Sequence, residues 1–432
     1  MADSLAERYA ASVAYLARAE AVIPLGSQTF SKSRTQYPVG AAPLFAARSQ
    51  GSHTWDIDGN EYVDLVSSLG AVALGYGDEE ITEAVVRQLR DGVTLSLATP
   101  IEAEVAERIV ALVPCAEQVR FAKNGTDATS GCIRLARAFT GREHVIVCGY
   151  HGWQDWYIGS TSMNRGVPER TRSLTHPVPY NDLPALEALI AELDGSVAAL
   201  IMEPMTSTWP AEGYLEGVRR ITTEHGIVLV FDEMLTGFRF APGGAQEHFG
   251  VTPDLASFGK ALANGFPLSA IAGRRDILEL MPSIFFSGTF GGETLSLTAA
   301  KIVLDRMATG EPTAALARIG QRLLDRVEET RPESSRAFLS FVGHPTWVFH
   351  QWTIDDAEVL AQAKTLLLQE MLRRGVLMLG THEVTTAHTD SDIELVAAAY
   401  AESLALVAAG LSSGDLLSRL ECEPIRPLFR VR

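Results

Sequence analysis

The chain has 432 residues, of which 36 are basic and 53 acidic, and its formal net charge is -17. This acidic balance argues against nucleic acid or an anionic membrane surface as a primary partner, and it favours small molecules or copies of the same chain. Hydrophobic residues make up 47% and charged residues 21% of the chain, as in globular proteins. We expect a large domain of roughly 200 to 270 residues and a smaller one.

Neither the cysteines nor the histidines are spaced as in a metal cluster. The four cysteines form no C-x-x-C pair and the ten histidines no H-x-x-x-H pair, so we expect no metal site and no disulfide framework. Residues 1–22 lack an apolar segment behind a basic flank, and no run of about 18 apolar residues occurs. We therefore expect no signal peptide, no membrane span and a reducing, cytoplasmic location.

The first segment of the chain, residues 1–76, combines a helix with a hairpin. Residues 1–22 predict an amphipathic helix, and residues 24–43, rich in Gly, Pro and Ser, predict irregular structure. Residues 52–66 alternate in polarity around an Asp-Gly pair, which favours a tight hairpin turn. We expect this segment to pack with the small domain.

Residues 77–330 predict a large α/β domain. Its short, continuously apolar runs are typical of buried parallel strands, and stretches of helical periodicity separate several of them. The predicted strands are 143–148, 197–203, 226–233, 255–260 and 268–273, and the predicted helices are 79–91, 101–113, 183–193 and 213–225. Their alternation indicates a mostly parallel sheet.

The last part of the chain, residues 331–432, predicts a smaller α+β domain. A long helical pattern over 294–330 ends at a boundary near 331–337. The elements expected beyond it are strand material over 338–352 and helices over 355–374 and 390–409.

Three predicted strands end in residue types that catalysis uses. Glu203 follows VAALIM, Asp232 follows GIVLVF and Lys260 follows LASFG. Because open α/β sheets bind ligands at the carboxyl ends of their strands, we expect the three in one site, although a lone acid such as Glu203 is as often a helix cap. Lys260 has small and apolar neighbours and no carboxylate within five positions, which favours a neutral, reactive amine. A lysine that forms an imine and an acid held against a ring nitrogen are what catalysis by pyridoxal 5'-phosphate (PLP) needs.

A phosphate site is predicted at Asn124-Gly125-Thr126, where a strand-like segment gives way to a helix. Backbone N–H groups at a helix start, together with the Thr126 hydroxyl, suit an anion. The same tripeptide is also compatible with an ordinary helix cap, so the assignment of a phosphate site depends on the other predicted site residues.

Aromatic and apolar contacts for a flat ring are available nearby. Tyr150 and His151 lie in a Gly-flanked loop after a predicted strand, and Met234 lies two residues beyond Asp232 on the same side of an extended strand. Aromatic residues in loops more often pack against the protein than stack on a ligand, so this assignment also depends on the other predicted site residues.

Five motifs, in this order, carry a resemblance to a known family: KNGTDATSGCIRLARAFTGR, GYHGW, VLVFDEMLTGFR, SFGKALANGFPLSA and SGTFGGETLSLTAA. Together they resemble the class III aminotransferases of PLP fold type I, most closely the branch around glutamate-1-semialdehyde 2,1-aminomutase. The match runs from VIPLGSQTF to TTAHTDSDIELV, nearly the whole chain. It implies an α/β fold whose large domain has a mostly parallel seven-stranded sheet flanked by helices, with a smaller α+β domain built from the N- and C-terminal segments.

The resemblance also implies roles around the cofactor ring. Lys260 would hold PLP as a Schiff base, Asp232 would pair with the pyridinium nitrogen and Tyr150 would stack on the ring. His151 and Glu203 would support the site.

Further roles concern the cofactor phosphate and a second subunit. Gly125 and Thr126 would hold the phosphate, and Thr289 would reach the phosphate of the neighbouring subunit's cofactor. The resemblance thus implies a homodimer with shared active sites.

Two departures from the aminomutase concern the substrate. Residues 23–32 read IPLGSQTFSK, so Lys32 stands where the aminomutase has the arginine that meets the substrate carboxylate, and a point charge replaces a planar fork. Residues 292–294 read Gly-Glu-Thr in place of Gly-Asn-Pro. The candidate substrate residues are Lys32, Arg34, Trp153, Trp209, Arg239 and Glu293. Lys32 and Arg239 would suit a carboxylate or phosphate, whereas Glu293 and the tryptophans would suit a hydroxylated or cyclic ligand.

The leading hypothesis is a PLP-dependent aminotransferase that acts on an amino-acid donor and a keto or aldehyde acceptor, in amino-sugar, polysaccharide or natural-product biosynthesis. The second keeps the cofactor and changes the reaction to an intramolecular amino transfer, as in the aminomutase, or to a racemase or decarboxylase. The third is a non-catalytic protein of the same fold. A nicotinamide enzyme is disfavoured because no G-x-G-x-x-G follows a strand.

Overall fold

The computed structural model describes residues 5–426, which divide into two compact units. Within the described range, the large unit comprises 70–73 and 79–315, and the small unit comprises 5–69, 74–78 and 316–426. The second boundary thus lies inside helix α15 (Glu311–Thr330), earlier than the expected 330/331. Helix α15 joins the small unit early because Gly320 lies directly against Pro345, where a Cβ would come within 1.9 Å of the carbonyl oxygen.

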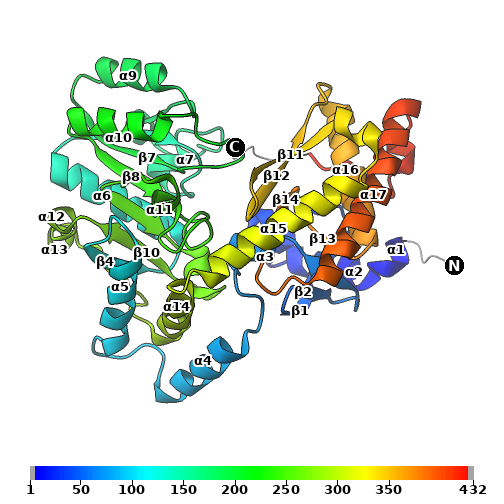
Figure 1. The fold of residues 1–432 in the computed structure, drawn as a ribbon, viewed down its shortest axis with the longest axis horizontal. Coiled ribbons are helices and arrows are strands. Elements are labelled where there is room, and N and C mark those ends of the chain that lie inside the picture. Colours follow the sequence, from blue (N-terminus) through cyan, green and yellow to red (C-terminus); the bar gives the residue numbers. More distant parts are fainter. Residues whose placement is uncertain (1–4, 427–432) are drawn as a thin grey trace. The chain divides into compact units, whose positions relative to one another are not determined.

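The large unit is built on a seven-stranded sheet of order β4-β10-β9-β8-β7-β5-β6 (Figure 1). Its strands are β4 (Gln118–Ala122), β5 (His144–Cys148), β6 (Thr175–Pro177), β7 (Val197–Met202), β8 (Val228–Asp232), β9 (Leu255–Phe258) and β10 (Ser269–Gly273). Strands β6, β5, β7, β8 and β9 pair in parallel, and β10 is antiparallel to both β9 and β4. The predictions of a mostly parallel sheet and of five strands at these apolar runs are confirmed, but the run 268–273, expected to be parallel, forms the antiparallel strand β10.

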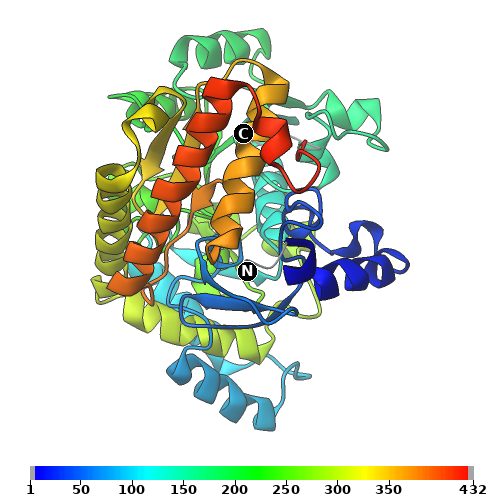
Figure 2. The ribbon, with the colours of Figure 1, turned by 90° about the vertical axis from the view of Figure 1, so that its right-hand side faces the viewer.

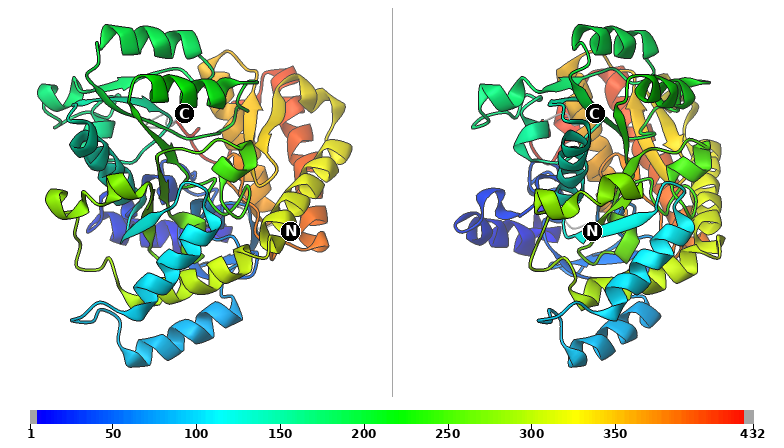
Figure 3. Two further views of the ribbon diagram at one scale, coloured as in Figure 1. Left: turned by 60° about the vertical axis from the view of Figure 1, so that its left-hand side comes forward. Right: turned by 90° about the vertical axis from the view of Figure 1, so that its left-hand side faces the viewer.

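Helices cover both faces of this sheet. The helices of the large unit are α4 (Glu79–Asp91), α5 (Pro100–Leu112), α6 (Gly125–Thr140), α7 (Asp155–Ile158), α8 (Glu169–Arg172), α9 (Leu183–Glu192), α10 (Tyr214–Glu224), α11 (Ala245–Phe249), α12 (Arg275–Leu278), α13 (Met281–Ile284) and α14 (Thr294–Met307). Helix α14 packs against α4 and α5 (Figure 3). The helical stretch expected over 294–330 is interrupted at 308–310, where Gly310 adopts a φ of 73° that no continuing helix accepts.

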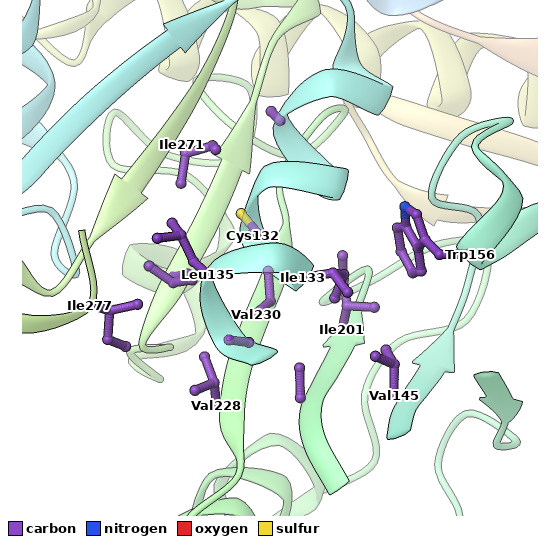
Figure 4. Close-up of a cluster of buried hydrophobic side chains, with 14 of the residues drawn as sticks. Cys132, Ile133, Leu135, Val145, Trp156, Ile201, Val228, Val230, Ile271 and Ile277 are labelled. Carbon is purple, nitrogen blue, oxygen red and sulfur yellow. The ribbon is translucent and has the colours of Figure 1, made fainter. Parts of the chain in front are cut away.

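Alternate residues of the strands enter two hydrophobic cores, because successive side chains of a strand point to opposite faces. Val228 and Val230 of β8 face α6, whose Cys132 belongs to the same core (Figure 4). Leu229 and Phe231 face α9 and α10 on the other side. The continuous apolar runs of β7 and β8 therefore reflect burial on both faces.

The small unit contains two sheets, of order β1-β2-β3-β13 and β11-β12-β14. Their strands are β1 (Ala46–Gln50), β2 (His53–Asp56), β3 (Glu61–Asp64), β11 (Leu339–His344), β12 (Trp347–Trp352), β13 (Val376–Leu377) and β14 (Thr381–His382). β2 and β3 form the predicted hairpin, with Gly59 at a φ of 89° in its turn. The expected strand material over 338–352 is a second hairpin, β11 and β12. Strand β1 carries no strand signal that predicted it from the sequence.

Helices α1 (Leu5–Arg8) and α2 (Ala10–Glu20) occupy the expected first helix, whose residues 1–4 lie outside the described range. Helices α16 (Ala357–Arg373) and α17 (Asp390–Ser413) lie side by side (Figure 2). By length and composition, α17 is the one described helix that could cross a membrane. Buried residues such as Val396 and Leu404 pack within the small unit and account for this apolar composition.

A cluster of three rings lies in the small unit, of which His382 and Tyr400 are buried and His350 is partly buried. The Tyr400 hydroxyl is 2.7 Å from Nε2 of His350 and 2.6 Å from Nε2 of His382. Burial lowers the pKa of His382 to about 3 and holds the pKa of His350 well below its ordinary value. Both imidazoles are therefore neutral in the folded protein near pH 7.

These histidines predict an acid-dependent loss of stability. An unfolded histidine binds its proton near the ordinary value of 6.5, so unfolding takes up a proton between that pH and the folded value of about 3, and stability falls as the pH falls through this window. His382→Gln should reduce this pH dependence by about 1.4 kcal/mol per pH unit. Melting temperatures at pH 7 and pH 5 test this, with the exposed His225→Gln as control. Equal decreases in the wild type and His382→Gln would contradict it.

Candidate active site

The residues expected in the site follow strands that end at one edge of the large unit's sheet. Strands β4, β5, β7, β8 and β9 run in one direction, since β4 and β9 are both antiparallel to β10. Thr126 follows β4, Tyr150 follows β5, Glu203 follows β7, Asp232 ends β8 and Lys260 follows β9. The carboxyl ends of parallel strands are where α/β sheets bind ligands.

Asp232 is 4% exposed and has hydrogen-bond partners on both oxygens. Its Oδ2 lies 2.8 Å from Nδ1 of His151, and its Oδ1 accepts from the Ser257 hydroxyl at 3.1 Å and the Met234 N–H at 3.2 Å. The parallel register places Ser257 of β9 opposite Asp232. Three segments of the chain therefore hold this carboxylate in one orientation.

Lys260 begins the short turn η3 (Lys260–Ala263) after β9 and is partly buried. Its φ of 47° is left-handed, a strained conformation for a residue with a side chain and one that clusters at functional sites. The preceding Gly259 lies so close to Met234 that a Cβ there would be 2.8 Å from Sδ. Close backbone packing thus sets where the lysine leaves the strand.

The start of α6 forms a cradle at the end of β4. The Asp127 carboxylate accepts the N–H of Asn124 at 2.8 Å and so fixes the first turn. Gly125 lies against Met234, and a Cβ added at Gly125 would come within 2.9 Å of the Met234 Sδ. The hydroxyl of Thr126 is buried and has no hydrogen-bond partner among the described residues.

The loop after β5 is seated between Glu203 and the α6 start. Oε2 of Glu203 accepts the N–H of Tyr150 at 3.0 Å, beside Gly149, where a Cβ would come within 2.6 Å of that oxygen. Gly152 adopts a φ of 103°, and a Cβ there would lie 2.5 Å from Oγ1 of Thr126. At both Gly149 and Gly152, any residue with a Cβ would clash with a side chain of the site.

His151 is 1% exposed and is held on two sides. The Thr129 hydroxyl donates to its carbonyl at 2.9 Å, and the Tyr157 ring packs edge-on against its imidazole at 5.3 Å. Tyr157 also packs edge-on against Tyr150 at 5.6 Å. Nε2 of His151 is buried without a hydrogen-bond partner among the described residues.

Several residues of this site were not among those expected. Ser257 lies three residues before Lys260, but its contact with Asp232 requires the strand register. Thr129 follows Thr126 by three residues, so helical spacing alone could have suggested that both face the same way. Tyr157 lies just beyond the GYHGW motif and carried no separate signal.

Glu233, the neighbour of Asp232, braces the segment after β8. It is fully buried and accepts from the N–H groups of Ala245 and Gln246, at 2.7 and 3.0 Å, and from the Thr236 hydroxyl at 2.6 Å. Burial raises the pKa of Glu233, and these hydrogen bonds oppose the rise. The acid therefore ties α11 to the end of β8.

Lys32 and Arg34 lie in the small unit and are exposed. Nζ of Lys32 donates to the Ser68 hydroxyl at 3.3 Å, within the short left-handed turn α3 (Ser67–Gly70). Arg34 pairs with Glu20. The ion pair accounts for the position of Arg34, while the long Lys32–Ser68 contact leaves the ammonium accessible.

The two tryptophans proposed for the substrate are both solvent-exposed. Trp153 is 65% exposed and Trp209 is 45% exposed. Trp209 packs beside His248 and Phe249, with ring centres 6.2 and 6.1 Å away.

Arg239 and Glu293 have protein partners that account for their charges without a substrate. Arg239 is fully buried, and its guanidinium donates to the carbonyls of Gly70 and Val72 at 3.2 and 2.9 Å. Glu293 caps the N-terminus of α14 and lies 2.8 Å from Nζ of Lys123.

Thr289 lies in an exposed tip between β10 and α14. Phe285 and Phe290, which flank it, are 83% and 59% exposed.

The large-unit site fits PLP. The unpartnered hydroxyl of Thr126 lies at a helix start with orphan N–H groups, which suits a phosphate, and Asp232 offers an oriented carboxylate for a ring nitrogen. Lys260 follows the neighbouring strand and supplies the amine for an aldehyde. An α/β sheet with this donor set defines a PLP-dependent enzyme of fold type I.

Comparison with known proteins agrees. Residues 36–387 match the family described as aminotransferase class-III. The chain is 31% identical over 417 residues to the 3-aminobutyryl-CoA aminotransferase of Cloacimonas acidaminovorans, and the match covers 94% of this chain and 99% of that protein. It is 33% identical over 433 residues to the glutamate-1-semialdehyde 2,1-aminomutase of Chloroflexus aggregans, and this match covers 92% of this chain and 98% of that protein.

The fold is also shared with the PLP internal aldimine form of the FumI protein of Sphingopyxis sp. MTA144. That structure superposes with a TM-score of 0.85 at 28% identity and covers 96% of this chain and 98% of the other. This protein belongs to the class-III aminotransferase family, and its cofactor is PLP.

The contact between Gly152 and Thr126 predicts a selective loss of cofactor affinity. Gly152→Ala adds a Cβ that displaces the Thr126 hydroxyl, so the dissociation constant for PLP should rise about tenfold or more. Gly166→Ala is the control, because Gly166 has a similar φ of 92° but open space around its Cβ position. Titration of the apoprotein with PLP measures both. Equal affinities in the two variants would contradict the placement of Thr126 at the cofactor.

Proposed function

We propose that this protein is an aminotransferase that moves an amino group from an amino-acid donor to a separate keto or aldehyde acceptor. The observation that carries the proposal is the Asp232 carboxylate, buried and oriented by His151 and Ser257 on the strand beside the one that leads to Lys260. A fixed carboxylate suits a protonated ring nitrogen, and a lysine at the adjacent strand end suits an aldehyde.

Each of these residues has a definite task in the proposed reaction. When bound, PLP supplies an electron sink that stabilises negative charge on the carbon that loses a proton. Lys260 would hold the cofactor through its amine and, once the donor amine has displaced it, would be the group that takes the proton from the donor's Cα. Asp232, which His151 keeps oriented, would pair with the ring nitrogen, and Tyr150 would contact the face of the ring.

The remaining contacts hold the rest of the cofactor. Gly125 and Thr126 bind the phosphate through the N–H groups of the α6 start and the free hydroxyl, with the helix dipole in favour. Met234, packed against both Gly125 and Gly259, supplies an apolar contact to the ring. Glu203 supports the site by holding the Tyr150 backbone.

A homodimer with shared active sites is part of the proposal. The exposed Phe285 and Phe290 support it, because burial against a second copy would remove both rings from water. In such a dimer Thr289, at the tip between them, reaches the phosphate bound by the other subunit.

The acceptor is proposed to come from amino-sugar, polysaccharide or natural-product biosynthesis in the cytoplasm. Lys32, in place of an arginine fork, suits a single anionic or hydroxyl group better than bidentate recognition of a carboxylate. The exposed Trp153 is available to a cyclic ligand.

An intramolecular amino transfer is the second candidate, and the 33% identity to a glutamate-1-semialdehyde 2,1-aminomutase favours it. The two reactions differ in stoichiometry. A mutase needs no separate donor and releases no 2-oxo acid.

A half-reaction assay separates these candidates. The cofactor–lysine link is expected to absorb at about 420 nm, and incubating the PLP-loaded protein with single amino acids should remove this absorbance and release one 2-oxo acid per site. Adding keto sugars or keto acids should then restore the absorbance. The Lys260→Ala variant should lack both the absorbance band and turnover. The control is Lys301→Ala, which removes a lysine of α14 that pairs with Glu104 of α5, and it should keep both. Turnover without any 2-oxo acid from any amino acid would favour the mutase and contradict transamination.

A further inference from the structure

Residues 286–293, here called the β4 strap, run beside the edge strand β4. Nη2 of Arg120 donates to the Phe286 carbonyl at 3.0 Å, and Gly291 lies against the carbonyl of Phe121, which a Cβ would approach to 3.4 Å. At its end, Glu293 meets Lys123. These three contacts attach the strap to β4 and to Lys123, the residue that directly precedes the phosphate cradle.

The last of these contacts is a largely buried ion pair. Nζ of Lys123 lies 2.8 Å from Oε1 of Glu293, and the two side chains are 17% and 10% exposed. The same carboxylate accepts the N–H groups of Leu295 and Ser296 at 2.9 and 3.1 Å. Burial by itself raises the pKa of Glu293, but the hydrogen bonds from Lys123 and Ser296 outweigh it, so the pKa lies below its ordinary value. Breaking one side of such a pair costs far more than breaking a surface pair.

Lys123 immediately precedes the cradle. The next residue, Asn124, donates its N–H to Asp127 at 2.8 Å and accepts the Ser269 hydroxyl at its carbonyl at 2.8 Å. The ion pair with Glu293 supplies a third attachment, from the side of the β4 strap. The position of the first α6 turn, and with it the Thr126 hydroxyl, is thus set from three directions.

We propose that Lys123 and Glu293 are positioning residues for cofactor phosphate binding: their ion pair locks the β4 strap to the start of α6 and holds Gly125 and Thr126 where the phosphate binds. This inference rests on the proposed function, since it assigns the α6 start to the phosphate. Neither residue contacts the phosphate. The pair also joins this subunit's cradle to the tip that carries Thr289.

Simple electrostatics predicts the opposite effect for one variant, which makes the inference testable. If Lys123 acted as a nearby positive charge, Glu293→Gln would free that charge and tighten phosphate binding. If the pair positions the cradle, Glu293→Gln weakens phosphate binding, although the glutamine oxygen can still cap α14.

The experiment compares PLP with pyridoxal, which lacks the phosphate, by titrating each into the apoproteins. Lys123→Gln, Glu293→Gln and the double variant should each raise the dissociation constant for PLP about tenfold and that for pyridoxal less than about twofold. Lys123→Arg should restore most of the affinity for PLP. Lys301→Gln, which breaks another α14 ion pair, should change neither constant. The double variant leaves no lone buried charge, so it reports on positioning even where a single variant folds poorly.

Three results would overturn the inference. They are unchanged or tighter PLP binding by Glu293→Gln, equal losses for PLP and pyridoxal in the double variant, and no recovery in Lys123→Arg. A wild-type protein that binds neither compound would instead contradict the proposed function itself, so the two failures are distinguishable.

Discussion

The carboxylate of Asp232 is buried at the end of β8, and the arrangement of the large unit depends on supplying it with hydrogen-bond donors. A carboxylate removed from water without donors costs several kcal/mol. Here the donors come from β9 through Ser257, from the loop after β5 through His151, and from the backbone of Met234. Only Met234 is near Asp232 in sequence, so the site exists only when the four neighbouring strands β9, β8, β7 and β5 are paired in their native register.

That register is fixed by burial on both faces of the sheet. Val230 and Phe231 enter different cores, and a shift of one residue would exchange these faces and also move Ser257 away from Asp232. Close packing at glycine completes the arrangement. Met234 fills the space against Gly125 and Gly259, so the cradle for a phosphate and the turn of Lys260 are spaced by one side chain.

Much of this could be predicted from the sequence because the signals are local. Continuous apolar runs identified the five central strands, and the polar residue at each strand end identified Glu203, Asp232 and Lys260. The contacts of Ser257, Glu233 and Lys123 depend on pairing between distant segments, which one sequence does not display. Arg239 and Glu293 illustrate the same difficulty from the other side, because an isolated charge in a sequence does not reveal the backbone carbonyls or the lysine that meet it in the fold.

The lysine after β9, beside the oriented Asp232, is the residue that we expect to carry the cofactor. Borohydride reduction of the PLP-loaded protein makes the link between cofactor and lysine permanent, and mass spectrometry of its peptides then identifies the modified residue. We expect modification of Lys260 alone. Modification of Lys123 or Lys32 in its place, or no modification in a protein that retains PLP, would contradict it.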